Sequence, residues 1–187
     1  MIFAVNTSGA GIEFVLGEHY KSIIPEKQST ALPAAANEFI AECGITWGDI
    51  TAIAVVVGPG SFTGIRLGIA FVKGIAIGLN IPVIPVNAFE LYLADTPDAF
   101  VAIESGRGDF FVGAANLPPQ TMDIDELESR QMAWPRTVGH RPFNMMHITQ
   151  IAEEKLATGG IEPVMPMYLR KSYAEEKKEP SNDNKKY

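Results

Sequence analysis

The chain has 187 residues, of which 47% are hydrophobic and 20% charged, a composition typical of globular proteins rather than disordered or fibrous ones. Its 15 basic residues are outnumbered by 22 acidic ones, and the net charge of −7 argues against nucleic-acid binding through its own surface. The single cysteine, Cys43, excludes an intramolecular disulfide. The length allows one domain or two small lobes.

The sequence predicts neither a secretion signal nor a membrane span. The first residues, Met1 to Asn6, lack the basic region and cleavage pattern of a signal peptide. The stretch 64–86 is long and apolar, but Arg66, Lys73 and two prolines do not suit a lipid environment. We therefore expect a cytoplasmic protein that does not associate with a membrane.

The chain begins with three predicted strands and a helix. Two turn sequences, N-T-S-G-A-G and G-E-H, separate short strands at 2–5, 12–16 and 20–24. A helix over 31–43 follows, because apolar side chains recur there at helical spacing. Thr30 is its expected cap, Gly44 its expected end, and Pro33 falls in its first turn, where proline is tolerated.

A strand and a glycine-rich helix come next and are the most informative part of the chain. The strand at Thr51–Val57 follows a short capped turn and runs through Gly-Pro-Gly-Ser into a helix at Ser61–Leu79 with almost no polar face. Four interior glycines cost that helix about 1 kcal/mol each relative to alanine, so other backbone must approach closely. A soluble helix that is apolar all round must be buried all round. We expect a partner to supply the second burying surface.

The remainder predicts a second, shorter half. A strand at 82–86 and a brief helix at 88–93, capped by Asn87 and Glu90, complete the order of a ribonuclease H-like unit. Two strands at 100–103 and 109–115, joined by E-S-G-R-G, are followed by helices at 124–132 and 147–157. The residues after Tyr173 are charged and show no periodic pattern of apolar side chains. We expect a first lobe at 1–97, an abbreviated second lobe at 98–172 and a disordered tail at 173–187.

Two turns are the best candidates for a nucleotide site. The turns Asn6–Gly11 and Glu104–Asp109 stand near the start of the two halves, as do the phosphate-gripping hairpins of actin-like ATPases and sugar kinases. Asn6 has no carboxylate and is a poor ligand for Mg²⁺, which argues against independent ATP hydrolysis. Asn6, Ser8 and Glu104 are the candidate residues for cofactor binding. The alternative is that the two turns are ordinary hairpin turns without a ligand.

The Gly58–Ser61 turn and the charged residues of the following helix each allow two interpretations. The Gly58–Ser61 turn is not a Walker A loop, so Ser61 and Thr63 either hold an anion at a helix N-terminus or merely cap the helix. The three histidines have no metal-ligand spacing, and no base accompanies Ser61 as a nucleophile, so we predict no metal ligand and no catalytic residue. Arg66 and Lys73 share one helix face, as solvated charges or as the polar edge of an interface.

The glycine-rich segment resembles a known family signature. G-P-G-S-F-T-G-I-R-L-G at Gly58–Gly68, with A-x-x-K-G-I-A at Ala70–Ala76, is similar to that of the TsaB family, also called YeaZ. The opening I-F-A-V-N-T-S and the closing P-M-Y-L-R resemble the same family. The resemblance is close over 6–89 and looser over 100–115.

The resemblance implies an actin-like α/β fold of two lobes and a non-catalytic role in tRNA modification. TsaB proteins are required for threonylcarbamoyladenosine at position 37 of tRNAs that decode ANN codons, because they bind and activate TsaD, which carries the metal and the transfer chemistry. TsaE joins the complex, tRNA is reached only through the complex, and the chain alone forms a homodimer. No cofactor of its own is implied, and any ATP or ADP is expected at the interface with TsaD.

The family interface is a helical bundle made by the helices at 31–43 and 61–79. The resemblance therefore implies a partner surface formed by Leu32, Ala36, Phe39, Phe62, Arg66, Gly68, Ile69, Val72, Lys73 and Gly74.

Departures from the family pattern bear on nucleotide binding. Asn6 stands where the family opens with aspartate, the segment after Ile24 reads P-E-K-Q-S-T, and Glu104-Ser105-Gly106 replaces D-A-R. The alternative function is an ATP-dependent phosphotransferase of the actin-like superfold, which the fold alone would permit. A metallopeptidase, the third alternative, needs ligands that the sequence lacks.

Overall fold

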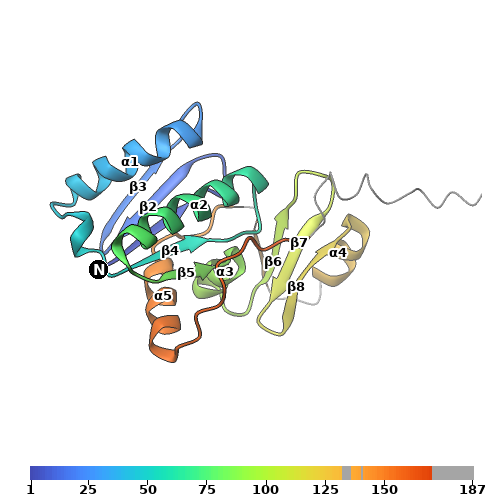
Figure 1. Cartoon of the computed structure of the whole chain (residues 1–187). Coiled ribbons are helices and arrows are strands. Elements are labelled where there is room, and N and C mark those ends of the chain that lie inside the picture. The colour runs from blue at the N-terminus through green and yellow to red at the C-terminus, as the bar shows by residue number, and fades with distance from the viewer. Residues whose placement is uncertain (132–135, 140, 170–187) are drawn as a thin grey trace, which may run out of the picture.

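The computed structural model describes residues 1–131, 136–139 and 141–169, and these build two β-sheets flanked by helices (Figure 1). The larger sheet has the strand order β3-β2-β1-β4-β5. Its strands are β1 (Ile2–Asn6), β2 (Ile12–Leu16), β3 (His19–Ile23), β4 (Ala52–Val56) and β5 (Val83–Val86). β1, β4 and β5 run parallel and β2 is antiparallel to them. This order confirms the predicted ribonuclease H-like, actin-like fold class.

Helices cover both faces of this sheet. Every residue of β1 and β4 is buried, as expected of parallel strands enclosed on both sides. Figure 1 shows α1 (Gln28–Glu42) and α2 (Phe62–Leu79) on one face and α5 (His147–Thr158) on the other. The predicted helix positions are thus confirmed, with ends that shift by a few residues.

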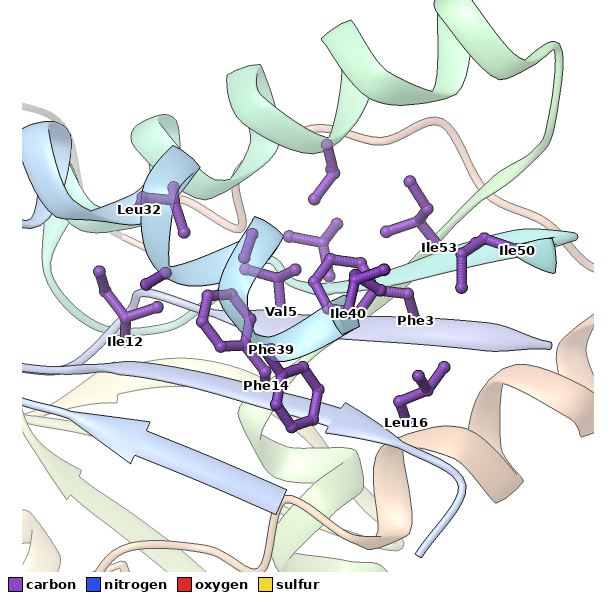
Figure 2. Packing of buried hydrophobic residues seen from close by; sticks show 14 of the residues in the cluster. Phe3, Val5, Ile12, Phe14, Leu16, Leu32, Phe39, Ile40, Ile50 and Ile53 are labelled. Carbon is purple, nitrogen blue, oxygen red and sulfur yellow. The ribbon is translucent and has the colours of Figure 1, made fainter. Parts of the chain in front are cut away.

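Aromatic rings fill the space between α1 and the sheet. Phe3 and Phe14 stack at 5.6 Å between ring centroids, Phe14 and Phe39 at 5.5 Å, and Trp47 meets Phe3 edge-on at 5.3 Å. Figure 2 shows Phe39 of α1 beside Phe14 of the sheet, with Leu32 farther along α1. Burying one such ring stabilises the fold by about 1.5–3 kcal/mol, so this cluster ties α1 to the sheet.

The smaller sheet has the order β8-β7-β6-β9, with β6 at Phe100–Glu104, β7 at Phe110–Ala114, β8 at Leu117–Met122 and β9 at Thr137–Val138. Its helix α4 spans Ile124–Gln131. The sequence did not predict β8 or β9, because β8 contains two prolines and β9 has two residues. Proline is tolerated in β8 because the strand lies at the sheet edge.

The chain returns to the larger sheet after the smaller one. The α5 side chains Ile148 and Ala152 are buried with Ile84 of β5, and the Met167 N–H donates to the Val57 carbonyl at 2.8 Å. The short helix α3 (Ala88–Asp95) packs on β6 and β7. The predicted lobe boundaries at 1–97 and 98–172 stay a prediction, and the predicted tail at 173–187 lies outside the described residues.

The start of α1 differs from the prediction. The helix begins at Gln28, Lys27 occupies the N-cap without a side-chain cap, and Pro33 lies inside the helix, so the predicted roles of Thr30 and Pro33 were wrong. The Gln28 side chain explains the earlier start, because its Nε2 donates to the carbonyls of Gly9 at 3.0 Å and Gly11 at 2.7 Å. A tertiary contact, rather than a local cap, sets this helix end.

The four glycines of α2 divide into two pairs. Gly64 and Gly68 face the chain's own Thr7, and a Cβ added to either would collide with the Thr7 carbonyl or hydroxyl oxygen. Gly74 and Gly78 are exposed, and a Cβ there would meet nothing within 4 Å. The prediction that Gly68 faces a partner was therefore wrong, because Thr7, directly after β1, and Val55 of β4 lie on that side of the helix.

The outer face of α2 is exposed. It carries Arg66, Ala70, Lys73, Gly74 and Ile77, so the described part of the chain buries one side of this apolar helix and leaves the other exposed. By length and composition α2 could cross a membrane, the one helix among the described residues for which this holds, and core helices of soluble proteins pass the same test.

Replacing Gly68 and Gly74 separately by leucine should give opposite results. Gly68→Leu forces bulk against Thr7 and should lower the free energy of unfolding by about 1–3 kcal/mol or more. Gly74→Leu adds a better helix former to open space and should leave stability unchanged or raise it by up to about 1 kcal/mol. Urea denaturation of both variants measures this, and equal loss in both would contradict the assigned helix faces.

Candidate functional site

A cleft of about 1050 Å³ opens where the larger sheet, the smaller sheet and the start of α2 meet. One wall is the turn after β1, and the facing wall is the turn after β6. Apolar side chains from several elements line its interior, namely Ile65, Ile103, Phe111, Phe143, Met167 and Leu169. The cleft brings together Asn6, Ser8 and Glu104, the three residues that the sequence marked as cofactor candidates.

Asn6 is buried, and its side chain is already engaged. It is 3% exposed, and its Oδ1 accepts from the Ser8 N–H at 2.9 Å and the Ser8 hydroxyl at 2.7 Å. Its Nδ2 donates to Glu13 Oε2 at 2.6 Å, and the other Glu13 oxygen accepts from the Tyr20 hydroxyl at 2.6 Å. Asn6, Ser8, Glu13 and Tyr20 thus form one hydrogen-bonded chain along this wall.

Tyr20 acts as the end donor of that chain. Partial burial and the hydrogen bond to Glu13 raise the pKa of Tyr20 above its ordinary value. The phenol therefore stays protonated at neutral pH and continues to donate. Each carboxylate oxygen of Glu13 therefore accepts a hydrogen bond from a protein donor.

The Gly-Pro-Gly-Ser turn joins the first wall to α2. The Ser61 N–H donates to the Ser8 carbonyl at 2.7 Å, and a Cβ on Gly60 would meet the same carbonyl. The Ser61 hydroxyl accepts from the Gly64 N–H at 3.2 Å, so it caps the helix. Of the two readings left open by the sequence, the structure supports helix capping by Ser61.

The second wall is a tight hairpin turn. Gly106 and Gly108 have φ values of +76° and +83°, which glycine adopts readily. The Ser105 hydroxyl donates to the Asp109 carboxylate and accepts from the Arg107 N–H at 3.2 Å. Glu104 lies at the end of β6 with an exposed side chain on the cleft.

No cluster of three or more histidine, cysteine or acidic side chains suited to a metal ion occurs within the described residues. His147 instead lies 3.3 Å from Asp95, between α5 and the end of α3. His140 lies outside the described residues.

Phe62, Arg66 and Tyr168 form an aromatic cluster at the mouth of the cleft that was not predicted from the sequence. The Arg66 guanidinium lies 3.8 Å from the centre of the Phe62 ring, and its Nε donates to the Tyr168 hydroxyl at 2.6 Å. The two rings stack at 5.0 Å. The Phe62–Arg66 pair could have been found from its helical spacing of four residues, whereas Tyr168 lies 102 residues beyond Arg66.

The ten predicted partner-surface residues fall into two groups. Six are buried in the chain's own interior, namely Leu32, Ala36, Phe39, Gly68, Ile69 and Val72. Four are exposed on α2, namely Phe62, Arg66, Lys73 and Gly74. The interface role itself stays a prediction, and only the second group has side chains or backbone on the surface of this chain.

Replacing Asn6 by aspartate should destabilise the chain in a pH-dependent way. Asn6→Asp puts a second carboxylate against Glu13 in a buried position, and like charges raise the pKa of one of them. The loss relative to the parent chain should be about 1–3 kcal/mol near neutral pH and should shrink as the pH falls and one carboxyl is protonated.

Thermal unfolding in EDTA at about pH 7.5 and about pH 4.5 measures this difference. Asn6→Ala, which removes the hydrogen bonds without adding charge, is the control, and its loss of stability should differ less between the two pH values than that of Asn6→Asp. A pH-independent loss in Asn6→Asp would contradict the Asn6–Glu13 contact.

The chain is similar to proteins of tRNA modification. A family model described as tRNA N6-adenosine threonylcarbamoyltransferase, TsaD, matches residues 18–129. The tRNA threonylcarbamoyladenosine biosynthesis protein TsaB of Haemophilus influenzae is 35% identical over 85 residues, which cover 41% of this chain and 32% of that protein. TsaB of Escherichia coli is 36% identical over 81 residues, covering 43% and 31%.

A catalytic relative matches as well. The tRNA N6-adenosine threonylcarbamoyltransferase of a Ruegeria species is 38% identical over 72 residues, covering 36% of this chain and 20% of that enzyme. The matched part of this chain thus spans about a third or less of each of these curated relatives.

A solved structure matches the fold over nearly its whole length. YeaZ from Pseudomonas aeruginosa superposes with a TM-score of 0.74 at 17% identity, covering 90% of this chain and 99% of that one. At this identity the likeness establishes the arrangement of strands and helices.

Proposed function

Because this chain belongs to the tRNA N6-adenosine threonylcarbamoyltransferase family, and within it to the TsaB or YeaZ group, we propose that it takes part in threonylcarbamoyladenosine formation on tRNA. The proposed role is that of a non-catalytic subunit, which binds TsaD and activates it for position 37 of ANN-decoding tRNAs. TsaE and tRNA are reached through that complex, the chain alone is a homodimer, and the complex is cytoplasmic.

The outer face of α2 is the observation that carries this proposal. Ile77 is 82% exposed, and Ala70 and Gly74 lie on the same exposed face within one or two helical turns. Exposed apolar side chains beside small residues let another helix approach closely, and removing this apolar surface from water favours association. A partner helix on this face would enclose α2 on both sides.

The side chains on the first wall of the cleft support the role of a non-catalytic subunit rather than that of a phosphotransferase. A phosphotransferase would need a carboxylate on the first wall to organise Mg²⁺, and Asn6 occupies that wall while Glu13 is held by Asn6 and Tyr20. ATP or ADP, if it takes part, is proposed to bind at the junction with TsaD.

An Ile77→Asp variant should lose the complex with TsaD. A charge at the centre of an apolar contact should weaken binding on the order of 30-fold or more, because the carboxylate is desolvated without a partner. Light scattering on a sizing column, with this chain and TsaD from the same organism, measures the complex. Reconstituted tRNA modification with TsaE and the enzyme that supplies threonylcarbamoyl-adenylate measures activation.

Ile124→Asp is the matched control, because Ile124 is an exposed isoleucine at the start of α4, outside the α2 face. It should bind and activate as the parent chain does. Separate elution of the parent chain and TsaD at tens of micromolar would overturn the proposal. Mg²⁺-dependent ATP turnover by the pure chain would favour the phosphotransferase instead.

A further inference from the structure

Arg66 is held in a fixed position at the junction of the cleft and the exposed face of α2. Phe62 lies one turn before it on the helix, and Tyr168 reaches it from the segment that follows α5. The guanidinium stacks on the Phe62 ring at 3.8 Å and lies 5.5 Å from the centre of the Tyr168 ring. Stacking on the Phe62 ring, together with the Nε hydrogen bond to Tyr168, restricts a side chain that otherwise has many rotamers.

The terminal N–H groups of the Arg66 guanidinium are available to donate further hydrogen bonds. Arginine carries five N–H donors, and Nε accounts for one, which the Tyr168 hydroxyl accepts. Within residues 1–131, 136–139 and 141–169, no carboxylate forms an ion pair with Arg66. Its planar fork matches the two oxygens of a carboxylate, so the side chain is pre-organised for an acceptor that this part of the chain does not supply.

We propose that Arg66 receives a carboxylate of the protein partner, and that Phe62 and Tyr168 form the apolar rim of the same contact. The proposal rests on the proposed function and adds the C-terminal segment to the docking surface. Phe62 is 37% exposed and Tyr168 46% exposed, so both rings present surface to a partner. Arginine flanked by aromatic rings is the composition typical of interface residues that dominate binding energy.

The charge of the chain explains why such a contact would set the register of the complex. The chain carries a net charge of −7, which on average disfavours an acidic side chain of the partner. Arg66 and Lys73 are the cations on the exposed face of α2, and Arg66 is the one held by aromatic rings. An acidic side chain placed opposite Arg66 therefore favours one alignment of the two proteins over others.

The cleft side of Arg66 carries charges of both signs. Glu13 and Glu104 line the cleft, one on each wall, and Arg107 lines it beside Glu104. A nucleotide phosphate inside the cleft would therefore meet two carboxylates, whereas a single carboxylate at the edge would meet the guanidinium of Arg66. The position of Arg66 on the exposed face of α2 favours the partner's carboxylate as occupant.

The test is the affinity of the full chain for TsaD from the same organism, measured by calorimetry at about 50 mM and about 500 mM salt. Arg66→Met keeps the apolar stem and should weaken binding on the order of 30-fold or more at low salt, and should also flatten the salt dependence. Arg66→Lys keeps the charge without the fork and should lose about tenfold. Tyr168→Phe, which removes only the hydroxyl, should lose a few-fold.

Arg130→Met is the matched control, because Arg130 is an exposed arginine on α4 whose partner is Glu126, four residues earlier. It should bind as the parent chain does. Thermal unfolding of every variant checks that the fold is retained.

Three outcomes would overturn the proposal. Failure of the parent chain to bind removes the proposed function and this contact with it. Normal binding by Arg66→Met keeps the proposed function and removes only the contact. Inorganic phosphate or ATP binding to the free parent chain, lost in Arg66→Met while TsaD affinity is unchanged, would make Arg66 a small-anion site.

Discussion

The close approach of α2 to the end of β1 is the constraint on which the rest of the molecule depends. The Thr7 hydroxyl donates to the Gly64 carbonyl at 2.7 Å, and neither Gly64 nor Gly68 could carry a side chain at this distance. Gln28 adds hydrogen bonds from α1 to the same turn. Two helices and the central strand therefore meet at one point, and the position of each is set by the other two.

This contact also decides what α2 shows to the outside. With Gly64 and Gly68 turned inward, the helix must present Arg66, Gly74 and Ile77 outward. Its N-terminus arrives beside the turn after β1, where Ser61 bonds to the Ser8 carbonyl. The outer face, the aromatic cluster and the cleft mouth are therefore one continuous surface along a single helix.

The cleft combines two facing turns with a first wall whose polar side chains bond to one another. Two hairpin turns face each other across a cavity of about 1050 Å³. On the first wall, however, Asn6, Glu13 and Tyr20 satisfy one another with protein hydrogen bonds. Because these polar side chains bond to one another, the wall is a stable end of the sheet.

Much of this protein could be predicted from local patterns in its sequence. The apolar runs of β1 and β4, the helical spacing of α1 and the capping residues Asn87 and Glu90 each report the structure of one element, and the structure confirms them. The order of these elements was enough for the fold class, because few topologies join them without crossing.

Tertiary structure alone decided which side of each element is covered. The glycines of α2 look alike in the sequence, yet Thr7 lies against Gly68 and open space against Gly74. The pairing of Arg66 with Tyr168 and the return of α5 to the larger sheet join segments far apart in the chain. Side-chain periodicity describes one helix or strand at a time. Which of its faces is buried, and against which residues, depends on how the rest of the chain folds back onto it.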